Sequence, residues 1–201
     1  MAQQFVETIK IKDGKAQSIA YHQYRMERTI RHFFPPLCLA SMPSLEELVI
    51  PKNDMSLYKC RVVYGENGVE YVEYTPYTMR KIASLQVVAD DTIEYAYKST
   101  DRSHFKALTS MKGDCDEIII IKQGLVTDTS FTNLAIYNGS HWITPMHPLL
   151  YGTKRAYLLD NGIIQESDIT LHDLQTAQKI RLFNAMIEFG EIEIPIENVR
   201  F

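Results

Sequence analysis

The stretch "DEIIIIKQGLVTDTSFTNLAIYNGSHWITP", residues 116–145, decides the fold. After its first two residues come four isoleucines in a row, at 118–121, and a turn at Gly124 brings this run to an end. Such a run is too short for a helix of its own and is typical of a strand buried on both faces. Further on, Asn138-Gly139 joins two short runs rich in apolar residues, which predicts a β-hairpin. We therefore expect a buried sheet in the C-terminal half of the chain.

The sequence on either side of this stretch predicts a larger C-terminal lobe over residues 82–201. Upstream, residues 83–90 and 92–99 read as extended runs, and a helix is expected over residues 102–112. Downstream, a helix is expected from near Gly152 to Asn161-Gly162, since a glycine suits the C-terminal end of a helix. The rest alternates short strands and short helices. We expect a mixed, barrel-like sheet in this lobe.

Residues 1–81 predict a smaller N-terminal lobe that mixes α and β structure. Alternating residues on both sides of Asp13-Gly14 predict a hairpin. A helix is expected over residues 21–34, stopped by Pro35-Pro36, because proline removes a donor and forces extended geometry on the preceding residue. A second hairpin follows in "LYKCRVVYG", "ENG" and "VEYVEYTPY". The predicted fold class is α+β with two lobes.

Composition excludes several classes of function. The chain has 201 residues, 45% of them hydrophobic, which is enough for a sizeable core. With 21 basic and 25 acidic residues it has no basic excess, so nucleic acid is not an expected partner. There is no signal-peptide pattern and no apolar run long enough to cross a membrane, so we expect a cytoplasmic protein without a membrane partner. The three cysteines and six histidines show no metal-ligand spacing, so no metal site is expected.

Lys98 lies in "YKSTDR", between an extended run and a helical pattern. By itself, a lysine in such a polar setting is more often solvated than chemically active. The "HQYRMER" stretch places His22 and Arg25 three residues apart on one helix face. Arg25 suits a phosphate or carboxylate, although a surface helix with several arginines is the commoner explanation.

Two further polar stretches lie in the C-terminal half. In "VTDTSFTN", Asp128 is followed by Thr129, Ser130, Thr132 and Asn133. Such clusters usually serve turns, yet this one adjoins a region that reads as buried, where each polar group needs a partner. In "LLYGTKR", the free backbone N–H groups of a helix that starts at Gly152 would suit an anion, against the alternative of a plain helix start.

Taken together and in order, these stretches resemble one family. The resemblance is carried by "FVET", "HQYRMER", "YKSTDR", "VTDTSFTN", "LLYGTKR" and "FNAM". They follow the pattern of the fold-type IV pyridoxal-phosphate enzymes, which include branched-chain aminotransferases, D-amino-acid aminotransferases and aminodeoxychorismate lyases. The resemblance covers nearly the whole chain, and residues 98–155 are its specific part.

The resemblance implies a cofactor, pyridoxal 5'-phosphate, in a cleft between the two lobes. It implies that Lys98 bonds covalently to the cofactor aldehyde and acts as the catalytic base and acid, and that Arg25 binds the phosphate. Asp128 would meet the pyridine nitrogen. The full set of implied cofactor-binding residues is Arg25, Lys98, Asp128, Ser130, Thr132, Asn133, Leu150, Gly152, Thr153 and Lys154. Among them, Leu150 would pack against the ring, the backbone of residues 152–154 would complete the phosphate cup, and Ser130, Thr132 and Asn133 would form a polar wall.

Two departures from the family pattern bear on function. The family's acid after the turn is normally a glutamate, and Asp128 is one methylene shorter. The chain also begins only a few residues before "FVET", so the N-terminal lobe reads as truncated relative to the family.

The resemblance leaves three functions open. The leading one is an aminodeoxychorismate lyase, which releases pyruvate and 4-aminobenzoate for folate synthesis; it rests on the short chain and on "FNAM". The second is an aminotransferase acting on branched-chain or D-amino acids. The third is a non-catalytic member that keeps the fold. The resemblance also implies a homodimer and a small-molecule amino substrate.

Overall fold

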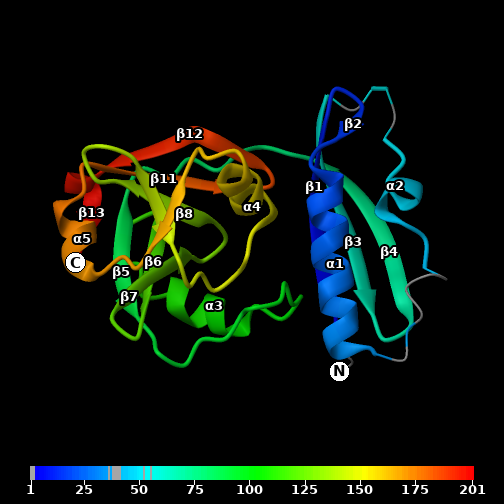
Figure 1. Cartoon of the computed structure of the whole chain (residues 1–201), viewed down its shortest axis with the longest axis horizontal. Helices are drawn as coiled ribbons and strands as arrows, with labels where there is room; N and C mark the ends of the chain where they lie inside the picture. The colour runs from blue at the N-terminus through cyan, green and yellow to red at the C-terminus, as the bar shows by residue number, and fades with distance from the viewer. Residues whose placement is uncertain (1–2, 36, 38–41, 52, 55) are drawn as a thin grey trace. The chain divides into compact units, whose positions relative to one another are not determined.

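The computed structural model describes residues 3–35, 37, 42–51, 53, 54 and 56–201. Its mixture of helices and sheets confirms the predicted combination of α and β structure (Figure 1). Pro36, half of the predicted helix stop, and Cys38 lie outside the described residues. The chain divides into two compact units. The first unit comprises Met1–Thr78 and Tyr97–Asp101, and the second comprises Met79–Ala96 and Arg102–Phe201.

The first unit is built on one antiparallel sheet with the strand order β2–β1–β3–β4. Both predicted hairpins are present, and Asp13 and Gly14 both adopt the left-handed backbone geometry that a tight turn requires (φ 49° and 69°). The predicted helix is also confirmed. The elements are β1 (Phe5–Lys12), β2 (Lys15–Ala16), α1 (Ile19–Phe33), α2 (Leu45–Leu48), β3 (Leu57–Gly65) and β4 (Gly68–Pro76).

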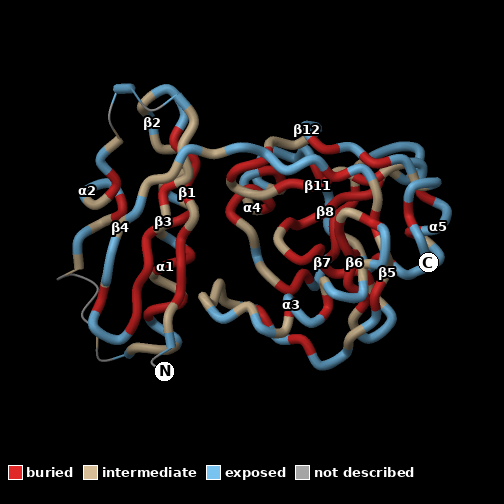
Figure 2. The backbone as a smooth tube through the Cα atoms, turned by 180° about the vertical axis from the view of Figure 1, so that it is seen from behind, coloured by how far each residue is buried: buried red, intermediate tan, exposed pale blue. Residues whose placement is uncertain are grey.

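The core of the first unit lies between α1 and the sheet (Figure 1). Met26 and Ile30 on the buried face of α1 belong to one apolar cluster with Phe5, Ile9 and Val62 from β1 and β3. Each such fully buried side chain contributes about 1.5–3 kcal/mol relative to an exposed one. Burial differs along the sheet. The strands β1 and β3 are buried along much of their length, whereas most residues of β4 are exposed or only partly buried (Figure 2).

The second unit contains two sheets, with the strand orders β13–β5–β6–β7 and β10–β9–β8–β11–β12. Parallel pairing joins β5 to β6, and antiparallel pairing joins β6 to β7 and β8 to β9. The elements are β5 (Leu85–Ala89), α3 (Ser103–Thr109), β6 (Glu117–Lys122), β7 (Leu125–Thr129), β8 (Asn133–Tyr137), β9 (Trp142–Pro145), α4 (Thr153–Asp160), β10 (Gln165–Ser167), α5 (Leu171–Thr176), β11 (Lys179–Asn184), β12 (Ile187–Pro195), η2 (Ile196–Asn198) and β13 (Val199–Arg200).

The isoleucine run behaves as predicted. Residues 118–121 form the middle of β6 and are all buried, so both faces of the strand are covered. The turn at Gln123-Gly124 and the hairpin turn at Gly139 take positive φ angles. The expected helix near Gly152 is α4, and Gly162 follows it with φ of 65°.

Two expectations in this region were wrong. Residues 92–99 were expected to be extended, but they form no strand, and Ser99 pairs with Phe5 of β1 as an isolated bridge. The helix expected over residues 102–112 is shorter, because α3 ends at Thr109. Among the described residues, no helix has the length and apolar character to cross a membrane.

Candidate active site

Lys98 lies in the first unit, on a segment held against β1 by backbone hydrogen bonds. The Val6 amide donates to the Lys98 carbonyl at 2.9 Å, and the Thr100 amide donates to the Gln4 carbonyl at 2.9 Å. Between them, Ser99 pairs with Phe5 in an antiparallel bridge. Lys98 is half-buried. Its position is therefore fixed by the sheet even though the segment itself is irregular.

An aromatic cluster on α1 anchors the same segment through Tyr97. The Tyr97 ring stacks on His32 at 4.7 Å between centroids and meets Phe33 edge-on at 4.8 Å. The guanidinium of Arg28 lies 5.1 Å from the centre of the Tyr97 ring. Offset and edge-on aromatic pairs are worth about 0.5–1.5 kcal/mol each beyond the apolar area that they bury. The residue next to Lys98 is thus attached to the helix as well as to the sheet.

Arg25, the residue assigned to the phosphate, forms a two-point salt bridge with Glu7 of β1. Arg25 Nε donates to Glu7 Oε1 at 3.0 Å, and Arg25 Nη2 donates to Oε2 at 2.6 Å. His22, one turn earlier on α1, places Nδ1 2.6 Å from the same Oε2. The side chains of Glu7 and His22 are fully buried, and that of Arg25 is 7% exposed. The alternative of a solvated surface arginine does not hold for Arg25.

The pKa values of Glu7 and His22 are both lowered in this cluster, but for different reasons. Burial alone would raise the pKa of Glu7, but the charge of Arg25 and hydrogen bonds from His22 and Arg25 outweigh it and lower the pKa from 4.5 to about 2. Burial lowers the pKa of His22, helped by the charges of Arg25 and Lys98 and opposed by Glu7. Glu7 is therefore ionised and His22 neutral near pH 7, with the His22 Nδ1 proton donated to Glu7.

Glu7 is the residue that sequence reasoning missed. It is part of the quoted "FVET" stretch, but it has no role among the implied site residues. A signal was present in the pattern, because Glu7 interrupts the apolar run of a strand whose other face carries Thr8 and Lys10. A carboxylate at such a position is buried and needs cationic partners.

Asp128, near the end of β7, lies at the centre of a polar cluster in the second unit that it forms with Asn133 and the backbone of Leu150. Its Oδ1 accepts from Asn133 Nδ2 at 2.7 Å, and its Oδ2 accepts from the Leu150 amide at 2.9 Å. Asn133 Nδ2 also donates to the Leu150 carbonyl at 2.9 Å. Burial raises the pKa of Asp128 from 3.8 to about 6, although these hydrogen bonds oppose the rise. The structure thus brings Asp128, Asn133 and Leu150 together, as predicted for one site.

Gly152 joins the same cluster as the residue that precedes α4. A Cβ atom at this position would overlap with Asn133 Oδ1 and lie 3.2 Å from its Cγ, so only glycine fits. The first backbone N–H groups of α4, from Thr153 and Lys154, follow directly. The N-terminus of a helix carries the positive end of the helix dipole, which makes the start of α4 suited to an anion. It adjoins the Asp128 cluster through Gly152.

The side chain of Lys154 points elsewhere. Its Nζ donates to Glu188 Oε2 at 2.6 Å and lies 5.3 Å from the centre of the Tyr157 ring. The side chain is 10% exposed. The ammonium group of Lys154 therefore stabilises the contact with β12.

The loop between β7 and β8 carries the remaining predicted wall residues. Thr132 and Thr129 bond to each other through their hydroxyl groups at 2.7 Å, so these side chains close the turn. The Ser130 carbonyl accepts from Arg102 Nη2. Arg102 also lies 4.5 Å above the Phe105 ring and 5.5 Å above the Tyr95 ring. The guanidinium of Arg102 therefore contacts a loop of its own unit.

A second buried arginine, Arg155 on α4, supports the loop that leads to Gly152. Its Nη2 donates to the Pro145 carbonyl at 2.8 Å and to Glu166 Oε1 at 2.5 Å. The charge of Arg155 also opposes the rise in the pKa of Asp128. The "LLYGTKR" stretch contained Arg155, but no site role had been assigned to it.

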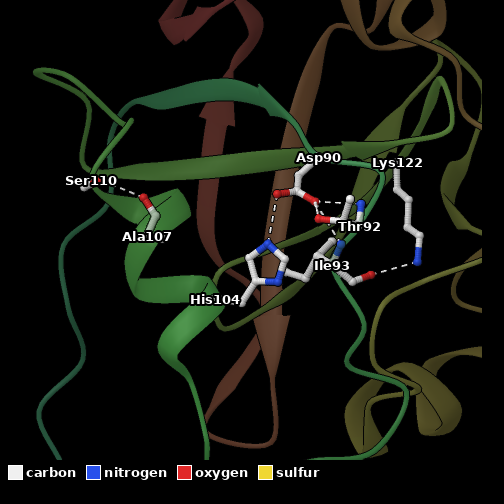
Figure 3. Close-up of polar contacts among 7 residues, drawn as sticks. All are labelled: Asp90, Thr92, Ile93, His104, Ala107, Ser110 and Lys122. Atoms are coloured by element: carbon white, nitrogen blue, oxygen red, sulfur yellow. Dashed lines mark hydrogen bonds and ion pairs between the residues drawn. The ribbon is translucent and has the colours of Figure 1, made fainter.

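A polar cluster around Asp90 fixes the turn that precedes the Lys98 segment (Figure 3). Asp90 Oδ1 accepts from the Thr92 hydroxyl group and from the amides of Thr92 and Ile93. Asp90 Oδ2 lies 2.9 Å from His104 Nε2 on α3, and Lys122 Nζ donates to the Ile93 carbonyl at 2.7 Å. The hydrogen bond with His104 is the largest cause that lowers the pKa of Asp90 to about 2. The chain thus leaves β5 along a defined path.

Asn184 of the "FNAM" stretch lies where β11 turns into β12. Its Oδ1 accepts from the amides of Met186 and Ile187, and its Nδ2 donates to the Phe131 carbonyl at 3.2 Å. The asparagine therefore ties this turn to the β7–β8 loop. In this chain the "FNAM" stretch supports the loop that carries Ser130 and Thr132.

The family model for amino-transferase class IV matches residues 4–193. The chain belongs to this family. It is 39% identical over 182 residues to an uncharacterized protein of Haemophilus influenzae, covering 90% of this chain and 96% of that protein. It is 26% identical to the aminodeoxychorismate lyase of Saccharomyces cerevisiae, covering 67% of this chain and 51% of the lyase. This chain thus spans about half the length of the yeast enzyme.

Solved structures agree with this family. A candidate 4-amino-4-deoxychorismate lyase from Haemophilus somnus is 36% identical, with a TM-score of 0.85 over 92% of this chain and 97% of that chain. The PLP-bound form of a hypothetical aminotransferase from Mycobacterium tuberculosis has a TM-score of 0.76 at 17% identity, over 98% of this chain and 81% of that chain. The second likeness shows the shared fold alone.

Proposed function

We propose that this class IV aminotransferase family member is a pyridoxal-phosphate-dependent lyase that converts 4-amino-4-deoxychorismate to 4-aminobenzoate and pyruvate. The observation that carries the proposal is the cluster in which the buried Asp128 carboxylate adjoins the start of α4 through Asn133 and Gly152. One unit thereby offers both a carboxylate and a set of N–H donors. A pyridine ring that carries a phosphate needs these two groups.

The residues present fit the cofactor. A dianionic phosphate suits the N–H groups at the start of α4 in the second unit, and Arg25 of the first unit is a cation of the kind that binds phosphate. The Asp128 carboxylate suits a protonated pyridine nitrogen, and Leu150 offers an apolar surface to the ring. Ser130, Thr132 and Asn133 stay proposed as the polar wall. Bound in this way, the cofactor would supply an electron sink for the negative charge that develops at the substrate α-carbon.

Lys98 has two tasks in this proposal. Its unprotonated amine would hold the cofactor through a covalent bond to the aldehyde carbon, whose oxygen leaves as water. Once the substrate amine has replaced it, Lys98 moves a proton at the substrate α-carbon, first as a base and then as an acid. The backbone bonds that fix Lys98 to β1 suit both tasks, because proton transfer requires the amine to return to one position.

A second function is an aminotransferase, and the family match favours it. Lys98, Asp128 and Arg25 would have the same roles in either reaction. An aminotransferase takes two substrates in turn and shows ping-pong kinetics, whereas a lyase takes one. We further propose that the protein works in the cytoplasm as a homodimer on a small amino substrate. Size-exclusion chromatography with light scattering tests the dimer.

The first experiment is an absorbance spectrum of the protein with added pyridoxal phosphate, before and after borohydride, with the labelled peptide mapped. The expected result is a visible band that borohydride removes, with the label on Lys98. Lys98→Ala is the matched variant and should give no label, while Lys106→Ala on the exposed face of α3 should label as the wild type does. Pyruvate release from 4-amino-4-deoxychorismate then tests the lyase against amino-acid donors. A wild-type protein without band or label would leave the non-catalytic alternative.

A further inference from the structure

Glu7 is a fully buried carboxylate to which the proposed chemistry gives no part. It accepts hydrogen bonds from Arg25 Nε and Nη2 and contacts His22 Nδ1, so three donors from α1 meet on one side chain of β1. All of these residues belong to the first unit. Stability alone does not explain a carboxylate at this buried position, because the attraction within a buried ion pair seldom exceeds the free energy lost when its charges leave water. A specific orienting role would explain its presence.

The geometry determines which part of Arg25 an anion can meet. The Nε–Nη2 edge of the guanidinium is occupied by the two carboxylate oxygens of Glu7, in the parallel two-point arrangement that makes arginine–carboxylate pairs directional. A phosphate bound by Arg25 would therefore meet the opposite edge of the guanidinium, which Nη1 and Nη2 form. The long arginine side chain has many rotamers, and a two-point salt bridge of this kind selects one of them.

His22 limits how Glu7 itself can move. Its Nδ1 shares Oε2 with Arg25 Nη2, so a rotation of the carboxylate would break contacts with both partners. Burial lowers the pKa of His22, and the contact with the ionised Glu7, which can only accept, places the proton of the neutral imidazole on Nδ1. Glu7 is thus held on two sides, which makes it a rigid support for the guanidinium.

We propose that Glu7 is a positioning residue that orients the guanidinium of Arg25 toward the phosphate of the cofactor. The inference rests on the proposed function, because it takes Arg25 as a phosphate ligand. The opposing possibility is that Glu7 only neutralises Arg25. The two roles predict opposite changes in phosphate affinity when Glu7 is replaced. Removal of a neutralising charge would leave Arg25 fully positive and strengthen phosphate binding, whereas removal of a support would let Arg25 turn away and weaken it.

The test compares two ligands, pyridoxal phosphate and pyridoxal, which differ only in the phosphate. Dissociation constants are measured by absorbance titration for the wild type, Glu7→Gln and Glu7→Asp. Glu7→Asp keeps the negative charge but shortens the side chain by one methylene. It therefore moves the carboxylate away from Arg25 without removing the charge that neutralises the guanidinium. Glu27→Gln is the matched control, because it removes the same charge from an exposed α1 pair with Arg31. Circular dichroism and thermal unfolding confirm that each variant is folded.

The proposal expects both Glu7 variants to bind pyridoxal phosphate about ten-fold more weakly or worse, as the loss of a charge-assisted contact implies. Pyridoxal affinity should stay within about three-fold of the wild type, and Glu27→Gln should change neither affinity. Tighter or unchanged binding of pyridoxal phosphate by the Glu7 variants would overturn the inference, and so would an equal loss for both ligands. A wild type that forms no borohydride-stable adduct at Lys98 would instead refute the proposed function.

Discussion

Gly152 and Asn133 lie so close that a Cβ atom on the glycine would overlap with Oδ1 of the asparagine. Asn133 cannot easily retreat, because its Nδ2 is bonded to Asp128 and to the Leu150 carbonyl. This contact joins the carboxylate cluster to the start of α4. The absence of a side chain at Gly152 is therefore a steric requirement of the site, since its φ of −70° is open to any residue.

The first prediction concerns this contact. Gly152→Ala should lower the free energy of unfolding by about 1–3 kcal/mol, the usual cost of overpacking a filled site. Urea denaturation measures the change. In the Asn133→Ala variant the side-chain oxygen that a Cβ at position 152 would meet is gone. The loss of unfolding free energy caused by Gly152→Ala should therefore be smaller in that variant by at least about 1 kcal/mol. Equal costs in the two backgrounds would mean that Asn133 is not the residue that excludes a side chain at Gly152.

The second prediction concerns the pH dependence of stability. Burial raises the pKa of Asp128 to about 6, above its unfolded value of 3.8. The stabilising contribution of this group is therefore fully present below about pH 4 and lost as pH rises through 6. Asp128→Asn has no such ionisation. Between pH 4 and pH 7, the difference in unfolding free energy between variant and wild type should shift in favour of the variant by up to about 3 kcal/mol.

This comparison is made on the cofactor-free protein by urea denaturation at pH 4, 5, 6 and 7. The variant should be the less stable protein at pH 4, because an asparagine cannot accept from both Asn133 and the Leu150 amide. The lowered pKa of Glu7 also adds pH dependence, but it is common to both proteins and cancels in the difference. Parallel stability curves over this range would contradict the raised pKa of Asp128.

The elements of the fold were largely predictable from the sequence, because their signals are local. Asp13-Gly14 and Asn138-Gly139 marked hairpin turns, and the isoleucines of β6 marked a buried strand. The Lys98 segment was predicted wrongly as a strand, since its alternating tyrosines imitate strand spacing. Its hydrogen bonds run to residues 4–6, far away in the sequence, and no local pattern reports such contacts.

The candidate site was predictable only in part, for a related reason. The family pattern supplied residue types and their order, including Asp128, Asn133 and Gly152, which the structure does bring together. It did not supply Glu7, whose partner Arg25 lies 18 positions away. A buried salt bridge between a strand and a helix depends on how the two elements pack against each other. The sequence of neither segment alone predicts that packing.

The third prediction concerns the aromatic anchor of the Lys98 segment. Tyr97→Ala removes the ring that contacts His32, Phe33 and Arg28, so it should lower the free energy of unfolding by about 2–3 kcal/mol. It should also slow covalent labelling of Lys98 by pyridoxal phosphate, since the segment loses one of its two attachments. Stopped-flow absorbance measures this rate. Tyr97→Phe keeps the ring and should label at close to the wild-type rate.

The matched control is Tyr24→Ala, which truncates a tyrosine of α1 that is 67% exposed. It should change stability by no more than about 0.5 kcal/mol and leave the labelling rate unaltered. If Tyr97→Ala lowered stability but labelled Lys98 at the wild-type rate, the ring would support the fold without positioning the lysine.

The last prediction concerns the identity of the acid. Asp128 is 4% exposed, and its carboxylate accepts from Asn133 Nδ2 at 2.7 Å and from the Leu150 amide at 2.9 Å. These donors are placed for a carboxylate on a short side chain. A glutamate would add a methylene to a filled site, at a cost of about 1–3 kcal/mol, and would carry the carboxylate past both donors. Asp128→Glu should therefore lower both stability and the affinity for pyridoxal phosphate.

Urea denaturation and absorbance titration measure these two effects, with Asp160→Glu at the exposed end of α4 as the control that adds the same methylene outside the cluster. The control should match the wild type in both measurements. The opposite result for Asp128→Glu, unaltered stability with tighter cofactor binding, would show that the site is built for the longer acid. The natural Asp128 would then bind the pyridine nitrogen more weakly than a glutamate does. That outcome would favour the non-catalytic alternative over the lyase. A loss in both measurements would instead show that Asn133 and Leu150 have adapted this site to an aspartate.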